Sequence, residues 1–367
     1  MGTTAREASG AARLAAPGEG ISAEELQLAA RNHAMPLEAL RYDVTPAGLH
    51  YLLIHFDIPY LDESTHTLSI DGLVRRPLSV DLAQLRGRPR QTHRVTLECA
   101  GNGRALLQPR PVSQPWLSEA VGTAEWTGTS LAALLDEAGV APGAHDVVFT
   151  GADHGIERGV EQDYQRGLPL AEAMREDVIV AYEMNGQPLL PQHGAPLRLI
   201  VPGWYGMAQV KWLTNVTVLD REFDGYQNAV AYRLRGDAED PGVPVTRMQP
   251  RALVRPPGFP DFMSRTRVVK AGVSTVEGRA WSGFGAVTAV EVTADGGGSW
   301  HPAQLGPVAG PYAWRGWSWR WEAAPGRAVL GARATDETGR VQPVQAEWNR
   351  GGFANNGVQQ VECVVVD

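Results

Sequence analysis

A cysteine at the end of a strand-like run is the residue in this chain whose surroundings best suit chemistry. Cys99 follows Val95–Glu98, and a Gly-Asn-Gly loop then leads to Arg104. A thiolate held on such a turn beside a cation is suited to nucleophilic attack or to binding a soft metal. Free cysteines are, however, usually small buried hydrophobic residues, and the local run by itself favours that simpler interpretation.

Three further segments combine glycine or proline with polar side chains. They are Gly151–Gly155 with Asp153, Pro191–Arg198 with His193, and Pro202–Met207 followed by Lys211. Functional side chains gather on loops after strands, and glycines let backbone N–H groups approach a phosphate. Taken alone, each segment is equally typical of an ordinary turn. The sequence has no Walker, H-E-x-x-H, C-x-x-C or G-x-S-x-G motif and no G-x-G-x-x-G after a strand, which disfavours common nucleotide, zinc and hydrolase chemistries.

Length and composition indicate a globular protein of two domains. The 367 residues exceed one ordinary core, and the hydrophobic content of 43% and charged content of 20% are normal. The net charge of −8 argues against broad nucleic-acid binding, and two cysteines cannot form a disulfide framework. No apolar run is long enough to span a membrane. Because Met1–Gly20 lacks a signal core or paired-arginine export motif, we expect a cytoplasmic protein, or a periplasmic one if a leader was removed.

Hydrophobic patterning predicts an N-terminal tail over residues 1–35 and a mixed first domain over residues 36–240. The tail is expected to be mobile or to form a frayed helix around Ser22–Asn32. Strands are predicted at Leu49–Phe56, Leu68–Gly72, Asp146–Thr150, Val178–Tyr182, Leu197–Val201 and Trp212–Leu219. Helices are predicted at Ser130–Ala138 and Leu168–Arg175. The pattern indicates an α+β domain and not a regular βαβ repeat.

The composition changes after a proline-rich stretch at residues 237–265, which is typical of a linker. Residues 241–367 are predicted to form a β-sandwich, with strands at Val287–Thr293 and Ala328–Thr335 and a turn at Asp295–Gly298. Seven of the eleven tryptophans lie between Trp281 and Trp348. We interpret them as sandwich core and subunit interface, with a carbohydrate-binding platform as the alternative.

Taken together, the ordered runs resemble the sulfite oxidase family of molybdenum enzymes. The matching segments are Thr96–Arg104, Ala181–Leu189, His193–Arg198, Val201–Gly203, Val210–Leu213, Ala280–Gly283 and Trp348–Asn349. They are collinear with the family and cover roughly residues 45–360. The resemblance implies a mixed α/β molybdopterin-binding domain of the sulfite oxidase fold, followed by an immunoglobulin-like β-sandwich that makes the chain a homodimer.

The resemblance also implies roles for particular residues. It implies that the Cys99 thiolate ligates molybdenum beside the dithiolene of the pterin cofactor. The residues implied to hold the molybdopterin and its phosphate are His55, Phe56, Asp57, Asp153, His193, Arg198 and Lys211. The residues implied to form the substrate pocket are Arg104, Trp116, Tyr232 and His55. A buried anionic cofactor needs paired cations and directed N–H donors, which accounts for these basic residues in an acidic protein.

Two positions depart from the family's pattern of pocket arginines. His55 stands where the family's Arg-Asn-His-x-Pro run has its arginine. Gly351 stands where a second arginine follows a Trp-Asn pair, with Arg350 one residue early, and a one-residue shift in an extended strand turns a side chain to the opposite face. We therefore expect less fixed positive charge than in the animal enzymes, partly restored when His55 is protonated.

The resemblance implies oxidation of sulfite to sulfate by oxygen-atom transfer, in which the protein supplies orientation and charge. The sequence has no Cys-x-x-Cys-His haem attachment, so no haem is expected and the electrons should pass to an external acceptor such as a cytochrome, or to dioxygen. Three alternatives stay open: a reductase of methionine sulfoxide or another S- or N-oxide, a sulfane dehydrogenase with a carrier-protein substrate, and a β-rich binding protein that has lost the cofactor. The missing arginines favour the reductase among these, since a neutral oxide needs no anion clamp.

Overall fold

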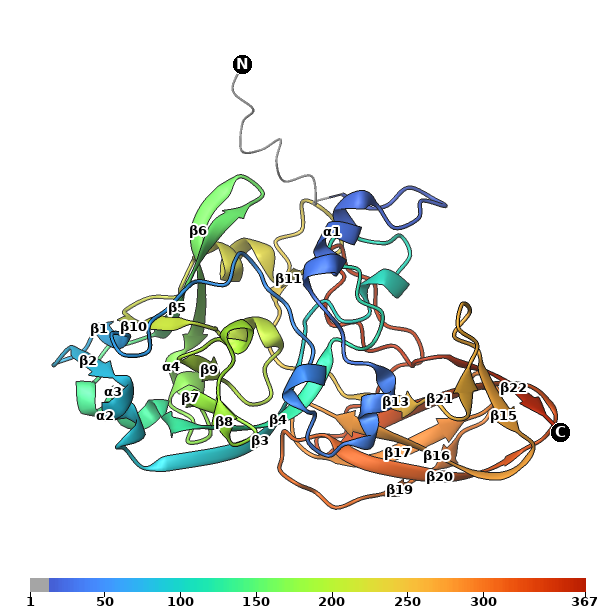
Figure 1. Cartoon of the computed structure of the whole chain (residues 1–367). Coiled ribbons are helices and arrows are strands. Elements are labelled where there is room, and N and C mark those ends of the chain that lie inside the picture. Colours follow the sequence, from blue (N-terminus) through green and yellow to red (C-terminus); the bar gives the residue numbers. More distant parts are fainter. Residues whose placement is uncertain (1–12) are drawn as a thin grey trace.

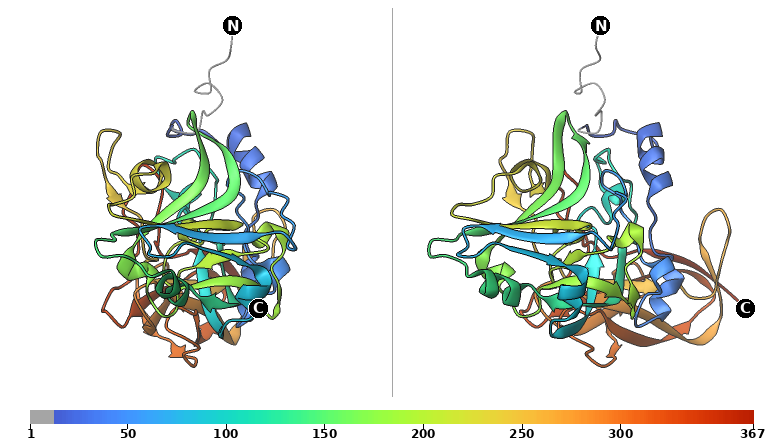
Figure 2. Two further views of the ribbon diagram at one scale, coloured as in Figure 1. Left: turned by 90° about the vertical axis from the view of Figure 1, so that its left-hand side faces the viewer. Right: turned by 60° about the vertical axis from the view of Figure 1, so that its left-hand side comes forward.

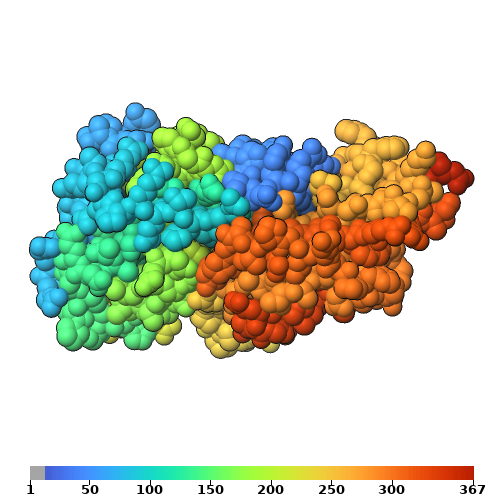
Figure 3. All heavy atoms as spheres, turned by 90° about the horizontal axis from the view of Figure 1, so that it is seen from below, coloured from blue at the N-terminus to red at the C-terminus, as the bar shows by residue number. Residues whose placement is uncertain are grey.

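The computed structural model describes residues 13–367, which are mainly β-sheet with a few short helices (Figure 1). Seen from below, the first domain and the C-terminal sandwich lie side by side (Figure 3). The predicted fold class, a mixed first domain followed by a β-sandwich, is confirmed. Residues 1–12 of the predicted tail lie outside the described residues. No helix within residues 13–367 is long and apolar enough to cross a membrane.

The described part of the predicted tail packs against the first domain. Helix α1 (Ala23–Arg31) forms where a helix was expected, and it begins with a capping box between Ser22 and Glu25. The Glu25 carboxylate is buried in an ion pair with Arg110. The 3₁₀ helices η1 (Leu37–Arg41) and η2 (Ala47–Leu49) then lead the chain into the first domain.

The strand predicted at Leu49–Phe56 does not form. After η2, residues 50–56 are irregular apart from one bridge between Leu52 and His33. The backbone of this segment bonds to side chains instead, since the carbonyl of Leu53 accepts a hydrogen bond from Lys211 Nζ at 2.8 Å. The apolar run therefore reflects burial and not sheet pairing.

The first domain contains a five-stranded sheet in the order β2-β1-β10-β5-β6. Its strands are β1 (Thr67–Gly72), β2 (Leu78–Asp81), β5 (Asp146–Glu157), β6 (Val160–Pro169) and β10 (Leu213–Leu219). Strands β5 and β6 form a long hairpin that projects beyond the rest of the sheet (Figure 2). The segment Gly151–Gly155, expected as a loop, instead lies inside β5, where the register shifts between Thr150 and His154.

A second five-stranded sheet carries the predicted cysteine site. It has the order β3-β4-β7-β8, and β9 also pairs with β7, over Ile179–Ala181. Its strands are β3 (Arg90–Glu98), β4 (Val121–Ser130), β7 (Ile179–Met184), β8 (Gln187–Pro188) and β9 (Arg198–Ile200). Strand β3 ends at Glu98, and its last four residues are buried. Cys99 is therefore the first residue after a buried strand end.

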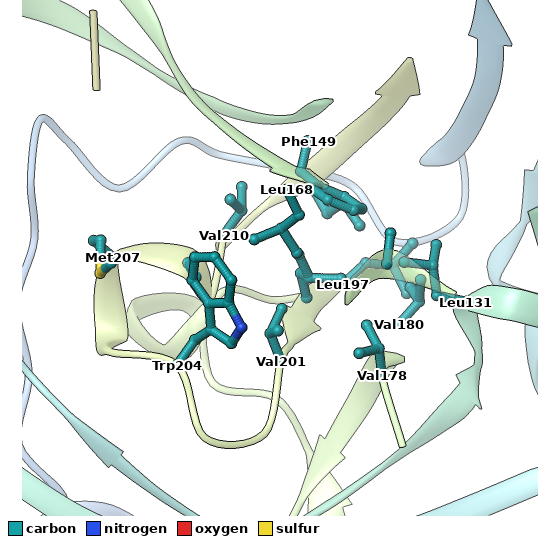
Figure 4. Packing of buried hydrophobic residues seen from close by; sticks show 14 of the residues in the cluster. Leu131, Phe149, Leu168, Val178, Val180, Leu197, Val201, Trp204, Met207 and Val210 are labelled. Carbon is teal, nitrogen blue, oxygen red and sulfur yellow. The ribbon is translucent and has the colours of Figure 1, made fainter. Parts of the chain in front are cut away.

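Three helices complete the first domain: α2 (Leu82–Arg86), α3 (Leu131–Ala138) and α4 (Leu170–Ala173). Helix α3 confirms the prediction at Ser130–Ala138, with the Ser130 side chain as its N-cap. The helix predicted at Leu168–Arg175 is only four residues long because β6 continues to Pro169. Buried residues from these helices and both sheets form a continuous core, part of which is drawn in Figure 4: Leu131, Phe149, Leu168, Val178, Val180, Leu197, Val201 and Val210.

Two sheets enclose the core of the C-terminal sandwich. One has the order β13-β16-β20-β19, with β13 (Arg251–Arg255), β16 (Gly272–Trp281), β19 (Gln304–Leu305) and β20 (Arg315–Ala323). The other has the order β14-β15-β22-β21-β17-β18, with β14 (Phe259–Pro260), β15 (Arg267–Lys270), β17 (Val287–Thr293), β18 (His301–Pro302), β21 (Gly326–Asp336) and β22 (Val361–Val366). A short pair, β11 (Arg233–Leu234) and β12 (Val243–Pro244), precedes them.

The linker interpretation of residues 237–265 is wrong for β13. Ala252, Leu253 and Val254 are fully buried, and β13 pairs along its whole length with β16. The interpretation of the tryptophans as sandwich core is confirmed for Trp317 and Trp321, whereas Trp281 and Trp314 are buried in the core of the first domain.

Candidate functional site

A pocket with about 670 Å³ of empty space lies beside Cys99. Six of the residues predicted from the sequence line it: His55, Cys99, Asp153, Arg198, Lys211 and Tyr232. These residues come from distant parts of the chain, and the irregular segment 50–56 forms one wall. The structure thus brings the separate sequence motifs into one site.

Cys99 is held rigidly at the inner end of this pocket. Its N–H donates to the carbonyl of Ala120 at 2.9 Å, and its own carbonyl accepts from the N–H of Asn102 at 2.9 Å. Burial raises the pKa of the thiol, while Arg104 and the Gly101 N–H oppose that shift. The thiol therefore stays protonated in the protein without a metal, and coordination to a metal would remove its proton.

The Gly-Asn-Gly loop after Cys99 folds Arg104 back toward the thiol. Gly103 adopts a φ of +89°, which favours glycine, and a Cβ at Gly101 would lie 2.7 Å from the Arg104 guanidinium. Arg104 Nε donates to the carbonyl of Gly351 at 2.9 Å. Arg104 is buried, and its charge and that of the thiolate form of Cys99 favour one another. The glycines therefore permit a buried cation beside the sulfur.

The position of the second missing arginine has a steric explanation. A side chain at Gly351 would collide with the ring of Phe353. That ring lies 5.0 Å from the Arg104 guanidinium and 5.1 Å from the ring of Tyr232. Gly351 and Phe353 thus place a carbonyl oxygen and an aromatic ring against Arg104, with no second guanidinium from this segment.

Tyr232 and Trp116 also lie close to Cys99. Tyr232 follows the π-helix η6 (Gln227–Ala231), an uncommon element that is frequent at functional sites. Burial raises the pKa of Tyr232, so its hydroxyl group stays protonated and can donate a hydrogen bond. The Trp116 indole approaches Cys99 closely enough to lower the pKa of the thiol, yet its buried N–H makes no hydrogen bond of ordinary geometry. That N–H is available to a ligand.

His55 lines the pocket, but its ring is already paired. Its Nε2 lies 3.0 Å from Glu157 Oε2, so the charge of a protonated His55 is compensated by a carboxylate. The other two members of its run do not line the pocket. The Phe56 ring packs against Gly155, and the Asp57 carboxylate accepts the N–H of Ile58 at 2.8 Å.

The far end of the pocket gathers buried cations. Lys211 Nζ donates to the carbonyl of Leu53 at 2.8 Å, and burial lowers the pKa of Lys211 to about 7. Arg198 donates to the carbonyls of His193 at 2.9 Å and Gln209 at 3.3 Å, and burial lowers its pKa to about 10. The Arg198 Nε has no partner among the described residues. These groups lack the hydration that a cation ordinarily has.

Two buried histidines and one carboxylic acid stand beside these cations. The rings of His50 and His193 meet edge to face with centroids 5.8 Å apart, and burial lowers their pKa values to about 4 and about 3. His50 Nε2 has no partner in the described part of the chain. Burial raises the pKa of Asp153 to about 6, although Lys211 opposes that shift. Desolvation dominates each of these shifts.

This end of the pocket fits a polyanionic cofactor. Arg198 is buried with an unpartnered Nε, and Lys211 is strongly desolvated, so both cations are costly unless groups of opposite charge bind there. Within residues 13–367, no group of three or more His, Cys, Asp or Glu side chains gathers as a metal site. A metal at Cys99 therefore needs ligands that the cofactor itself supplies.

Several residues of the site escaped the sequence analysis. His50 and Tyr51 line the pocket from the run that was interpreted as a strand, and Tyr164 lines it from β6. Arg166, also on β6, is almost fully buried and lies 5.6 Å from the ring of Tyr232. A lone arginine in a buried strand is a signal that could have been used. No feature of the sequence indicates the hydrogen bond between Glu157 and His55.

The matched families describe molybdenum-cofactor enzymes. Residues 55–227 match the family described as "Oxidoreductase molybdopterin binding domain". Residues 263–365 match the family described as "Mo-co oxidoreductase dimerisation domain".

Individual proteins are also similar to this chain. The chain is 33% identical over 350 residues to the mitochondrial sulfite oxidase of Homo sapiens, covering 88% of this chain and 62% of that protein. It is 32% identical over 342 residues to nitrate reductase [NADH] 1 of Oryza sativa subsp. japonica, covering 85% and 37% respectively. It therefore spans less than two thirds of the length of these curated relatives. A crystal structure of the sulfane dehydrogenase SoxCD from Paracoccus pantotrophus matches with a TM-score of 0.78 and 28% identity, over 89% of this chain and 82% of that one.

Proposed function

Since the chain belongs to the sulfite oxidase family of molybdopterin-dependent oxidoreductases, we propose that it oxidises sulfite to sulfate at a molybdenum cofactor held in the Cys99 pocket. The observation that carries this proposal is the polarity of the pocket. Arg104 and Tyr232 form one group with Cys99, on which they act electrostatically, and the desolvated Lys211 forms a second group with Arg198.

The cationic end is suited to hold the pterin and its phosphate. Lys211 and Arg198 supply charge, while neutral His50, whose Nδ1 donates to the carbonyl of Tyr51, leaves Nε2 as an acceptor for an N–H group of the pterin. Their desolvation is offset when an anion binds, so the cofactor should stabilise the folded protein. The Cys99 thiol loses its proton when it becomes a ligand.

At the other end, the chain itself orients the substrate. The cofactor, when bound, supplies the oxygen atom that is transferred and accepts the two electrons that sulfite releases. Arg104 holds an oxyanion through its guanidinium, and the protonated Tyr232 donates a hydrogen bond to it. The Trp116 indole N–H is a third donor, and the Phe353 ring excludes water from Arg104. These groups fix the sulfur toward the Cys99 side of the pocket.

Electrons leave to an external acceptor such as a cytochrome, or to dioxygen, in this proposal. The matched dimerisation family over residues 263–365 supports a homodimer built through the sandwich. Exposed apolar side chains at the turn between β14 and β15 are consistent with a contact surface, since Phe262 and Met263 are each 83% exposed.

A second candidate is sulfane dehydrogenation. It is favoured by the anionic partner of His55, Glu157, which reduces the positive charge offered to a free oxyanion. It is also favoured by the similarity to a structure named as a sulfane dehydrogenase. Reduction of a neutral S-oxide is the third candidate, and the same loss of positive charge suits it.

The test is a comparison of substrates with protein produced in a host that makes the cofactor. Molybdenum is first measured per chain, and turnover is then followed with a dye as acceptor for sulfite and a protein-bound sulfane, and with reduced dye for methionine sulfoxide. We expect one molybdenum per chain and the highest kcat/KM with sulfite. Higher kcat/KM with the sulfane or the sulfoxide would replace the proposal with the corresponding alternative.

A further inference from the structure

An acidic side chain stands behind the wall of the pocket that His55 forms. Glu157, the last residue of β5, accepts hydrogen bonds at Oε2 from Gln227 Nε2 at 3.0 Å and pairs there with His55 Nε2 at 3.0 Å. Its side chain is 26% exposed, and the pairing lowers its pKa despite the opposing effect of burial. It is therefore a carboxylate at neutral pH.

The negative charge of Glu157 acts on the two residues proposed to bind the substrate. Glu157 acts electrostatically on both Arg104 and Tyr232, so it opposes the positive potential that an incoming anion meets. Arg158, its exposed neighbour at the hairpin turn, offsets part of that effect from the solvent side. Screening weakens the exposed charge more than the partly buried one.

The position of Glu157 is fixed by more than its own strand. Gln227 belongs to the π-helix η6 that ends just before Tyr232, and the Gln227 carbonyl accepts a hydrogen bond from the buried Arg166 at 2.5 Å. A contact between Glu157 and η6 thus ties the β5–β6 hairpin to the element that carries Tyr232. The carboxylate cannot swing into solvent without breaking two hydrogen bonds.

We propose that Glu157 is a specificity-determining residue, which makes the pocket select sulfur compounds with at most one negative charge over dianions. For sulfite, this means that the enzyme binds the hydrogensulfite monoanion in preference to the dianion. The inference rests on the proposed function to the extent that this end of the pocket is the substrate site. The geometry that carries it is a carboxylate fixed by hydrogen bonds to His55, which lines the pocket, and to Gln227, which lies five residues before Tyr232.

The experiment uses three unreactive ligands of similar shape and different charge. Binding of sulfate, methanesulfonate and dimethyl sulfone to the molybdenum-loaded protein is measured by calorimetry at one pH and low salt. The charges of these ligands are two, one and zero, so the energy of interaction with Glu157 scales in the same order. The Glu157→Gln variant keeps the side-chain shape and removes the charge.

We expect Glu157→Gln to tighten methanesulfonate about threefold and sulfate about tenfold, because the effect on the logarithm of the affinity doubles with the ligand charge. Dimethyl sulfone should bind as it does to the wild type. The control is Glu161→Gln on the same hairpin, where a carboxylate 73% exposed pairs with His154 away from the pocket. It should change none of the three affinities.

Equal changes for all three ligands, no change for sulfate, or the same change in Glu161→Gln would overturn the proposal. Glu157→Ala, which needs no room for an amide, repeats the test if Glu157→Gln does not fold. Sulfite turnover by the wild type is measured separately. Charge selection without sulfite turnover would refute the proposed reaction and keep this inference, whereas turnover without charge selection would refute the inference alone.

Discussion

Glu98, the residue before Cys99, connects the two domains through a buried ion pair. Its Oε1 lies 2.8 Å from a guanidinium nitrogen of Arg251 in the sandwich and accepts from Asn102 Nδ2 at 2.9 Å. Its Oε2 accepts from Trp281 Nε1 at 2.9 Å. Glu98 and Arg251 are each only 2% exposed. We predict that Glu98→Gln both weakens the domain contact and disturbs the loop that positions Cys99.

The expected loss of stability follows from the hydrogen bonds and the charge that a glutamine amide at position 98 cannot supply. Three donors converge on the two carboxylate oxygens, and a glutamine offers one oxygen and one NH₂ group. At least one buried donor therefore faces another donor, and the Arg251 cation loses its counter-charge. Breaking a buried pair on one side costs about 3–5 kcal/mol, so we expect a loss of about 3 kcal/mol in the free energy of unfolding. Since a domain is stable by about 5–15 kcal/mol, this is a large fraction of the total.

The assay is reversible urea unfolding followed by tryptophan fluorescence and circular dichroism on the wild type, Glu98→Gln and the double variant Glu98→Met with Arg251→Met. Apolar side chains of similar volume remove both charges together, so the double variant should recover most of the loss. The control is Glu322→Gln, which breaks an ion pair with Arg320 at 3.4 Å in which the two side chains are 75% and 71% exposed. It should cost less than about 1 kcal/mol. A loss at Glu98→Gln no larger than that of the control would refute the reasoning.

Three further predictions concern the cofactor end, the substrate end and the dimer. In the cofactor-free protein, Lys211→Met should raise the melting temperature by its full amount at pH 7 and below and progressively less from pH 7 to pH 10.5, because in that range the folded protein has released a proton that the unfolded chain keeps; a pH-independent gain would contradict this. Tyr232→Phe should lower kcat/KM for sulfite by about 10- to 100-fold without loss of molybdenum, and unchanged kinetics would remove Tyr232 from the substrate site. Phe262→Asp combined with Met263→Asp should halve the mass found by sedimentation from twice 39.6 kDa, whereas a persistent dimer would place the interface elsewhere.

The strongly patterned elements could be predicted, and the others failed for identifiable reasons. Helix α3 has an apolar face and a serine cap, so its local sequence and its final packing agree. The run at Leu49–Phe56 is apolar because it lines the pocket, and periodicity reports burial without saying what the backbone pairs with. Strand β13 was hidden because Pro250 and Pro256 bound it closely on both sides, although neither enters it.

Some residues of the site could likewise be predicted from the sequence, and others could not. Cys99, Arg198 and Lys211 could be found because ordered motifs of the family carry them. The partnership of His55 with Glu157 could not, since 102 residues separate the two in the sequence. Nothing in either residue type points to the other at that separation, and the contact exists because the folded chain brings the end of β5 to the irregular segment 50–56. Such non-local pairs decide the charge of a pocket, and the structure is needed to see them.

The central claim is that the Cys99 thiolate binds molybdenum in an enzyme that oxidises sulfite. It is tested most directly by counting the sulfur neighbours of molybdenum, using X-ray absorption, alongside sulfite-dependent dye reduction in Cys99→Ser and Cys363→Ser. Cys363, the other cysteine of the chain, is also buried but lies in β22 of the sandwich. We predict that Cys99→Ser loses one sulfur neighbour and the turnover, while Cys363→Ser keeps both. A Cys99→Ser protein with the wild-type sulfur count and wild-type turnover would contradict it.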